Sequence, residues 1–285
     1  MSANQSYWLA PAKLNLFLHI TGRRSDGYHE LQTLFQLLDY GDELRITPVS
    51  GTTLSLHLAA QSPVQDMPLD GNLILRAAQL LRDRAGDTSL GASIQLCKRI
   101  PTGAGLGGGS SDAATTLLAL NELWQLDLAL EDLLEIGLQL GADVPVFLQG
   151  RTAWGEGIGE QLEAVELPVC WYLVITPQCQ VSTARIFSQP DLTRNSPTIK
   201  IADFLAGRAR NDCESSTRKL YPQVDEALIW LNQHGDARMT GTGASVFASF
   251  EDRDSAEQVL ALLPPNLSGF IAEGVNSLER HRIAA

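Results

Sequence analysis

The chain has 285 residues, enough for one large or two ordinary domains. Its 44% hydrophobic and 19% charged content is typical of a globular protein with a sizeable core. The formal net charge of −12 argues against nucleic acid and against an anionic membrane as partners, because both carry phosphate groups that attract positive charge.

The first predicted element is a strand over residues 13–20. Its even-numbered positions are leucine or isoleucine, which predicts one apolar face. Lys13 and Asn15 alternate with these positions, so both side chains project from the opposite face. That arrangement fits a shared polar site, and it fits equally an ordinary half-buried strand with a polar outer face.

Further strands are predicted before the first helix. A turn at Asp26-Gly27 leads to Tyr28, His29 and a strand pattern ending at Leu38, and strand-like runs follow at 43–47 and 53–58. Asn72 is suited to cap a helix that reaches about residue 82. Strands followed by helices indicate an α+β fold.

A glycine-rich loop is the most informative segment. It follows a predicted strand at 92–97 and precedes a predicted helix at 111–124, and five of the seven residues from Gly103 to Gly109 are glycine. Ser110, Ser111 and Asp112 are residue types that begin helices, so we expect the glycines just ahead of the helix. Backbone amides of such a loop, with the positive end of a helix behind them, favour a polyphosphate ligand.

Other interpretations of this loop are weaker. The spacing G-x-G-x-x-G permits a dinucleotide site, but Asp127, the acidic residue at suitable distance, precedes a helical pattern at 128–140 rather than ending a strand. A Walker A loop needs lysine where Gly109 stands, and no V-A-I-K strand of a protein kinase follows. A flexible loop without a ligand is the structural alternative.

Asp143 is a candidate general base in the segment Leu140–Gln149. Gly141 can end the preceding helix, and Pro145 restricts the residue before it, so the carboxylate is held rigidly. A fixed carboxylate can accept a proton from a hydroxyl. Local sequence alone nevertheless favours the simpler interpretation of Asp143 as a helix cap.

The glycines at 150, 155, 157 and 159 indicate a domain boundary, which we place between residues 1–157 and 158–285. Beyond it we expect a strand at 171–176, and Thr183 and Phe187 on one face if their segment is helical. A helix is expected at 221–234. Residues 238–247 are typical of a glycine turn that enters a strand, which predicts a hairpin or a bulge.

The cysteines and the apolar segments indicate the cellular compartment in which we expect the protein. Cys97, Cys170, Cys179 and Cys213 lack C-x-x-C spacing, which favours reduced thiols in the cytoplasm. Strand-like sequence begins by Trp8, so no signal peptide is expected, and no apolar run approaches the length of a membrane span.

Taken in this order, the segments resemble a known family. The glycine loop with its following S-S-D-A-A resembles the ATP loop of the galactokinase, homoserine kinase, mevalonate kinase and phosphomevalonate kinase (GHMP) superfamily. Segments 11–18, 24–29 and 140–145 are similar to those of the 4-diphosphocytidyl-2-C-methyl-D-erythritol kinase family, of the non-mevalonate isoprenoid pathway. The resemblance implies a two-domain fold with the active site in the cleft between the domains.

The resemblance also implies roles for individual residues. Asp143 takes the proton from the 2-hydroxyl of the substrate, and Lys13 lies beside it and offsets the charge of the phosphoryl group in transfer. Mg²⁺ is expected with Ser110 or Ser111 as the nearest hydroxyl. The residues implied in binding ATP are Asn72, Lys98, Pro101, Thr102, Gly103, Ala104, Gly105, Leu106, Gly107, Gly108, Gly109, Ser110 and Ser111.

By the same resemblance the substrate carries a cytidine diphosphate. Tyr28 and Phe187 would stack on the cytosine ring and His29 would contact its edge, while Asn15 and Thr183 would contact the methylerythritol and phosphate portions. Residues that would support the phosphate site from the second glycine turn are Thr242, Gly243 and Ala244. The expected partner is this small molecule alone, and the expected state is a monomer or weak homodimer.

Three alternatives stay open at this point. A superfamily kinase for homoserine or mevalonate would give Tyr28 and Phe187 no base to contact. A non-catalytic nucleotide or sugar sensor predicts loss of Lys13 or Asp143, and both are present. An oxidoreductase is disfavoured by the helical pattern after Asp127.

Overall fold

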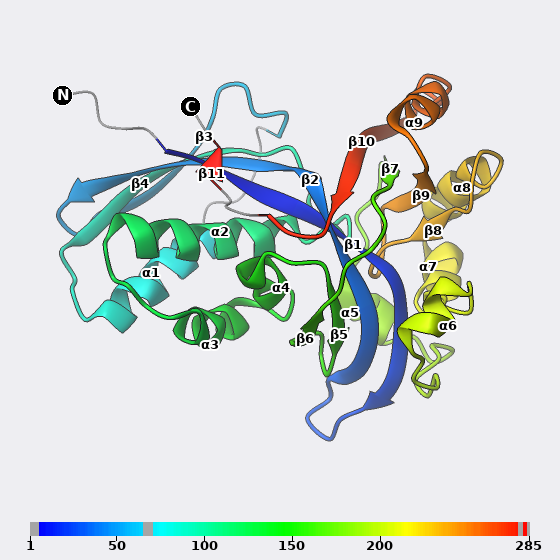
Figure 1. Ribbon diagram of the computed structural model, residues 1–285, viewed down its shortest axis with the longest axis horizontal. Coiled ribbons are helices and arrows are strands. Elements are labelled where there is room, and N and C mark those ends of the chain that lie inside the picture. The colour runs from blue at the N-terminus through cyan, green and yellow to red at the C-terminus, as the bar shows by residue number, and fades with distance from the viewer. Residues whose placement is uncertain (1–5, 65–70, 279–281, 284–285) are drawn as a thin grey trace.

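The computed structural model describes residues 6–64, 71–278 and 282–283 (Figure 1). Its strands are β1 (Ser6–Arg23), β2 (His29–Ser50), β3 (Leu54–Leu58), β4 (Leu90–Cys97), β5 (Ala153–Glu156), β6 (Gln161–Ala164), β7 (Trp171–Pro177), β8 (Arg238–Met239), β9 (Val246–Phe250), β10 (Leu267–Val275) and β11 (Arg282–Ile283). Its helices are α1 (Leu73–Ala85), α2 (Gly108–Leu123), α3 (Leu130–Leu140), α4 (Val144–Gln149), α5 (Thr183–Phe187), α6 (Ile201–Leu205), α7 (Glu214–Leu220), α8 (Pro222–Leu231) and α9 (Arg253–Leu260). Helices and strands together confirm the α+β class.

Two long antiparallel strands, β1 and β2, run from the half of the molecule that holds helices α1 to α4 to the half that holds helices α6 to α9 (Figure 1). The sequence predicts two separate strands where β2 continues without a break. Gly41 explains the difference, because a side chain there would overlap the backbone of Ala10 on β1. The glycine therefore permits close approach of two paired strands and does not end one of them.

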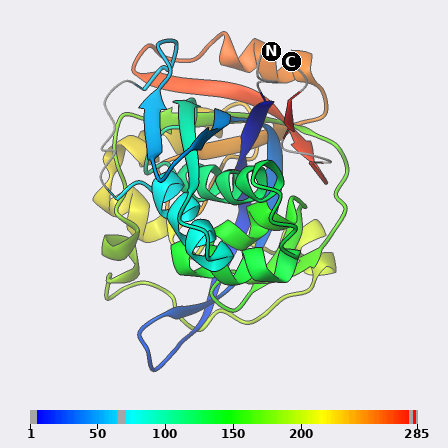
Figure 2. The same ribbon diagram turned by 90° about the vertical axis from the view of Figure 1, so that its left-hand side faces the viewer.

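Helices α1 to α4 cover one side of the strands of the first half, as Figure 2 shows for α1 to α3. Leucines, isoleucines and alanines of α1 and α2 pack with β1, β2 and β4 in one buried cluster, which includes Leu44, Ile94 and Leu117. Both faces of β1 are buried from Ala10 to Ile20. The polar side chains of β1 are therefore interior groups that need partners.

The second half is tied to the first through β10. This strand pairs with β7 along its length and with β2 near its end, at Gly274 and Val275. β7 pairs with β9, and β9 pairs with β8, which confirms the predicted hairpin at the second glycine turn. A bridge between Leu18 and Asn211 makes a further connection. The domain division after residue 157 stays a prediction.

Several helix boundaries differ from the predictions, among them the end of α1, the start of α2 and the end of α8, which is at Leu231 and not at 234. Asn72 caps α1 as expected, its side chain accepting a hydrogen bond from the backbone N–H of Ile74 at 2.9 Å, but α1 extends to Ala85. Helix α2 begins at Gly108 and not after the glycines, because Gly107 takes the cap position with φ +73°. The last two glycines of the loop therefore form the first turn of the helix.

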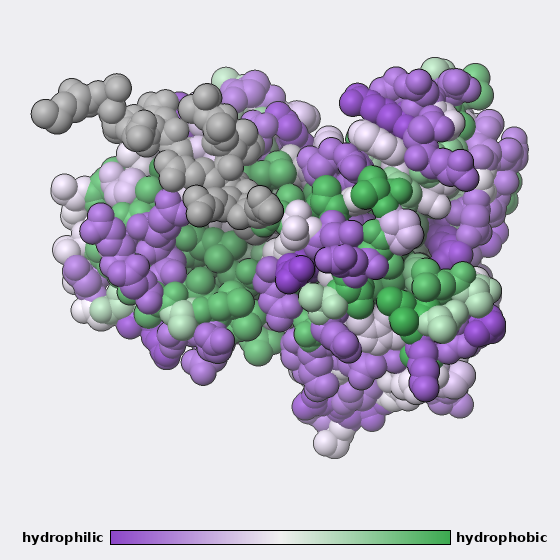
Figure 3. All heavy atoms as spheres, in the orientation of Figure 1, coloured by the Kyte–Doolittle hydropathy of each residue, from purple (hydrophilic) through white to green (hydrophobic). Residues whose placement is uncertain are grey.

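The face shown in Figure 3 is largely hydrophilic, with hydrophobic residues gathered over helices α2 to α4. Leu130 and Leu138 of α3 are among the exposed apolar side chains. Within the part of the chain that the structure describes, no helix is long and apolar enough to cross a membrane.

Candidate active site

A cavity of about 800 Å³ is lined by residues from both halves of the chain. Strands β1 and β2, the glycine loop, the start of α4, helix α5 and the second glycine turn all contribute. The predicted site residues that line it are Lys13, Asn15, Tyr28, His29, Gly105, Gly107, Ser110, Asp143, Thr183, Phe187 and Thr242. Residues far apart in the sequence are thus brought to one cavity.

The Lys13 ammonium group is the most connected group of this cavity. Its Nζ lies 3.3 Å from an Asp143 carboxylate oxygen, donates to Asn15 Oδ1 at 2.5 Å and donates to the Gly105 carbonyl at 3.1 Å. Lys13 is buried, whereas the Asp143 side chain is 36% exposed. The buried cation therefore joins β1, the glycine loop and the start of α4, and the carboxylate faces the cavity.

Asp143 occupies the cap position of α4, yet its side chain makes no capping hydrogen bond. Its carboxylate is directed to Lys13 instead. The interpretation of Asp143 as a helix cap, which local sequence favours, is therefore not supported by the geometry. The partner of Asp143 is Lys13, which lies 130 positions away in the sequence, so no local pattern could indicate the pair.

The glycine loop is held by its carbonyl groups. The Ala104 carbonyl accepts from the Ser245 N–H and the Leu106 carbonyl from the Lys13 N–H, both at 3.0 Å. The Gly105 carbonyl accepts from Lys13 Nζ at 3.1 Å and from the Thr240 hydroxyl at 3.3 Å. Within the described residues, the backbone N–H groups of 105–110 make no hydrogen bond. These donors are free for an anion.

Gly107 is required for packing as well as for backbone geometry. A Cβ at this position would lie 2.7 Å from Cζ of the buried Phe147 and 3.1 Å from Cε of Lys13. Its φ of +73° is in the region that favours glycine. Gly109, in the first turn of α2, has room for a Cβ at 3.7 Å from Leu73.

The aromatic end of the cavity is formed by Tyr28, His29 and Phe187. The His29 and Phe187 rings are stacked, with centroids 4.9 Å apart and planes at 24°. The Tyr28 side chain is 60% exposed. Phe187 thus contacts His29 directly, while the enclosure of a base between Tyr28 and Phe187 stays a prediction.

The second glycine turn contacts α5 at the same cavity. The Thr183 and Thr242 hydroxyl groups are 3.0 Å apart and share a hydrogen bond. Ala244 is buried in the second-half core, and Gly243 packs against Met239 and Thr217. Of the three residues predicted in this turn, Thr242 is the one whose side chain reaches the cavity.

Of the thirteen residues predicted to bind ATP, Gly105, Gly107 and Ser110 line the cavity and the other ten do not, Asn72 and Lys98 among them. Asn72 caps α1. Lys98 is buried, with its ammonium group between the carboxylates of Asp42 and Asp112, 2.8 Å from the latter. Burial lowers the pKa of Lys98, but the carboxylates of Asp112 and Asp42 raise it by more, so the pKa is raised overall. Burial raises the pKa of Asp112 to about 8. Lys98 therefore pairs with Asp42 and Asp112 behind the glycine loop.

The two predicted hydroxyl candidates for a metal are placed differently. Ser110 lines the cavity, whereas Ser111 is fully buried and its hydroxyl has no hydrogen-bond partner in the part of the chain that the structure describes. No cluster of three or more metal-binding His, Cys, Asp or Glu side chains occurs among the described residues. Oxygen ligands from one carboxylate, a hydroxyl and phosphates suit Mg²⁺, which keeps several waters.

The sequence does not reveal three residues at or near this cavity. Thr33 accepts from Asn15 Nδ2 at 2.9 Å and donates to the Phe17 carbonyl at 2.5 Å, which orients Asn15. Arg23 brings a positive charge to the cavity wall near His29. Arg194 donates to His29 Nε2 at 3.2 Å. Strand alternation could have indicated Thr33, but no local signal marks the two arginines.

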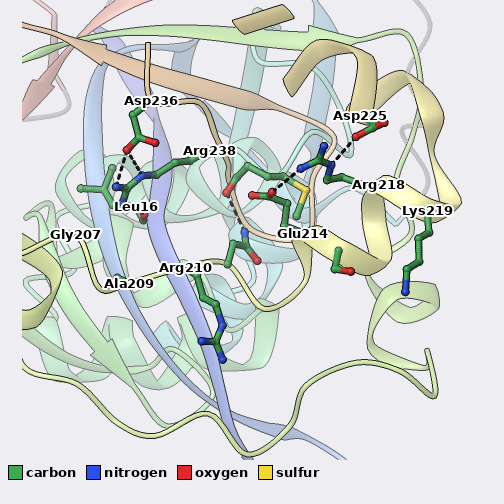
Figure 4. Close-up of a pocket in the computed structure, with 13 residues that line it drawn as sticks. Leu16, Gly207, Ala209, Arg210, Glu214, Arg218, Lys219, Asp225, Asp236 and Arg238 are labelled. Atoms are coloured by element: carbon green, nitrogen blue, oxygen red, sulfur yellow. Dashed lines mark hydrogen bonds and ion pairs between the residues drawn. The ribbon is translucent and has the colours of Figure 1, made fainter. Parts of the chain in front are cut away.

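A second cavity, of about 830 Å³, lies in the second half of the chain (Figure 4). Its basic side chains are already paired: Arg218 with Glu214 and Asp225, and Arg238 with Asp236. Arg210 and Lys219 pair with acidic residues as well. Paired cations have less positive charge to offer a phosphate, so this cavity suits a polyanion poorly.

Comparison with known proteins agrees with this geometry. The model of the GHMP kinases N terminal domain matches residues 72–151, and that of the GHMP kinases C terminal matches residues 197–264. The 4-diphosphocytidyl-2-C-methyl-D-erythritol kinase of Pseudomonas paraeruginosa is 55% identical over 96% of this chain and 95% of that protein. The enzyme of the same name from Shewanella pealeana is 53% identical over 94% and 93%.

The chain belongs to the 4-diphosphocytidyl-2-C-methyl-D-erythritol kinase family. It is therefore an ATP-dependent kinase with a small-molecule substrate, and the resemblance drawn from its motifs is confirmed. A crystal structure of 4-(cytidine 5'-diphospho)-2C-methyl-D-erythritol kinase has a TM-score of 0.81 at 35% identity and covers 94% of this chain and 99% of that one. Methanococcus jannaschii mevalonate kinase, with a TM-score of 0.68 at 16% identity over 97% and 100%, shares the fold.

Gly107→Ala should destabilise the protein by about 2–4 kcal/mol, because the added methyl group overlaps Phe147 and the backbone is left-handed. The matched control is Gly109→Ala, where the space is open and alanine favours the helix by up to about 1 kcal/mol. Urea unfolding measures both. Equal stability of Gly107→Ala and the unaltered protein would contradict the packing described here.

Proposed function

We propose that this kinase transfers the γ-phosphoryl group of ATP to the 2-hydroxyl of 4-diphosphocytidyl-2-C-methyl-D-erythritol in the cavity described above. The observation that carries the proposal is one shared cavity for the Lys13–Asp143 pair, the free amides of the glycine loop and the aromatic group around His29. Phosphoryl transfer needs positioned reactants and positive groups at the phosphates. The three parts supply these needs side by side.

Asp143 is proposed as the general base. Its carboxylate faces the cavity and is held by the buried Lys13, which positions it to accept a proton from a hydroxyl. Lys13 would also offset negative charge on the phosphoryl group in transfer. The Lys13 hydrogen bond to the Gly105 carbonyl sets the distance between this pair and the proposed phosphate site.

The glycine loop is proposed to bind the phosphates of ATP through the N–H groups of residues 105–110, with the positive end of α2 behind them. Asn72 and Lys98 would support the nucleotide pocket from behind the loop. Mg²⁺ would be held by Ser110, the one of the two candidate hydroxyls that lines the cavity. When bound, the metal neutralises charge on the β- and γ-phosphates.

The aromatic end is proposed as the cytidine pocket. Phe187 from the second half and Tyr28 from the first supply ring surfaces, and His29 lies against Phe187. Asn15, Thr183 and Thr242 line the same cavity. Asn15 and Thr183 would contact the methylerythritol and phosphate portions, and Thr242 would support the phosphate site. Homoserine and mevalonate carry no base, so these aromatic residues favour the cytidylated substrate over both.

The proposed setting is the cytoplasm, with a monomer or weak homodimer as the active form and no nucleic acid or membrane partner. The net charge of −12 and four free cysteines support this setting.

Asp143→Asn should lower kcat by roughly 10²–10⁴-fold, because an amide cannot accept the proton. The affinity for ATP should change less than about twofold, since the glycine loop is intact. Steady-state kinetics and calorimetry measure the two effects. Asp132→Asn, a carboxylate of α3 that pairs with Arg84, is the control and should keep full activity. Near-normal turnover of Asp143→Asn would exclude it as the base.

Phe187→Ala should raise the KM for the cytidylated substrate about tenfold or more, because base stacking contributes about 1–3 kcal/mol. The KM for ATP should stay nearly constant. Free methylerythritol, which lacks the base, should be a poor substrate for the unaltered protein and no worse for the variant. Equal use of free and cytidylated methylerythritol by the unaltered protein would exclude the cytidine pocket and leave the kinase assignment intact.

A further inference from the structure

Arg194 connects the segment between α5 and α6 to the aromatic end of the cavity. Its guanidinium group donates to the carbonyls of Phe187, Gln189 and Leu192 at 2.9, 2.7 and 3.1 Å. Its Nε donates to His29 Nε2 at 3.2 Å. One side chain therefore fixes the end of α5 and the imidazole that stacks on Phe187.

The bond to His29 determines where the imidazole carries its proton. An arginine side chain has only donors and stays charged, so His29 Nε2 must accept with its lone pair. A neutral imidazole that accepts at Nε2 carries its proton at Nδ1. Within the described part of the chain, Nδ1 makes no hydrogen bond of its own. His29, which lines the cavity, thus has one N–H donor left for a ligand.

The surroundings keep this imidazole neutral. Burial lowers the pKa of His29, and the positive charges of Arg194 and Arg23 lower it further. Arg194 lies on the Nε2 side, and Arg23 is the ladder partner of His29 on β1. A doubly protonated ring would also lose the Arg194 hydrogen bond, because it has no lone pair to accept with.

We propose that Arg194 is a positioning residue for base recognition, which holds His29 as the Nδ1–H tautomer so that the cavity presents a donor to the edge of the base. This inference rests on the proposed cytidine pocket. A donor at this point suits cytosine, whose ring N3 has a lone pair. In uracil N3 carries a proton, so the two donors would oppose each other. Arg194 thereby contributes to the choice between the two pyrimidines without contacting either.

The tautomer can be measured without any substrate. The ¹⁵N chemical shifts of the two His29 ring nitrogens in the free protein distinguish a protonated from an unprotonated nitrogen. We expect a protonated Nδ1 and an unprotonated Nε2. After Arg194→Met, the ring should lose this preference and populate the Nε2–H form.

Kinetics on two substrates test the consequence. The unaltered protein should prefer the cytidylated over the uridylated methylerythritol by about tenfold or more in kcat/KM. Arg194→Met should reduce this preference to about threefold or less by raising the KM for the cytidylated substrate. The KM for ATP should stay unchanged. Arg208→Met is the matched control, since Arg208 lies just after α6 and pairs with Asp203. It should retain the preference.

The outcomes separate the inference from the proposed function. An unaltered protein that uses neither substrate contradicts the proposed function, whatever the tautomer. A protein that uses the cytidylated substrate but holds His29 as the Nε2–H form overturns the inference. A raised KM in Arg194→Met with an unchanged tautomer also overturns it, because the role is then only structural. Should Arg194→Met unfold, the tautomer and the substrate preference of the unaltered protein decide.

Discussion

The Lys13 ammonium group is the interaction on which the site depends. It lies inside the protein, where an unpaired charge is costly, and three acceptors from three elements satisfy it: Asn15 on β1, the Gly105 carbonyl and Asp143. The carbonyls of the glycine loop accept from Lys13, Thr240 and Ser245, whereas the amides of residues 105–110 have no partner among the described residues. One buried cation thus orders the loop and pairs with the proposed base.

The two halves of the chain meet at this cation. β1 carries Lys13 and Asn15 and continues to the turn before Tyr28, while Thr240 of the second glycine turn accepts from the Asn15 N–H and donates to the Gly105 carbonyl. The aromatic end is joined in the same way, since Arg194 of the second half bonds to His29 of the first. A ligand that spans the cavity therefore contacts both halves.

Local patterns in the sequence predict much of this, and long-range pairing explains what they miss. The first strand, the Asn72 cap and the hairpin at the second glycine turn follow from alternation, capping and turn chemistry, which act over a few residues. The continuity of β2 and the role of Lys98 do not follow from local patterns. The first depends on the close approach of Gly41 to Ala10, and the second on Asp42, which is 56 positions from Lys98. Family resemblance supplied Asp143 where local sequence favoured a cap.

The central claim is that Lys13 and Asp143 act as one unit in phosphoryl transfer. A double-mutant cycle on kcat with Lys13→Ala, Asp143→Asn and the double variant tests it most directly. Residues that act together are strongly non-additive, so the double variant should be slower than the worse single variant by no more than about threefold. Losses that multiply across the two substitutions would show independent roles and would contradict the account.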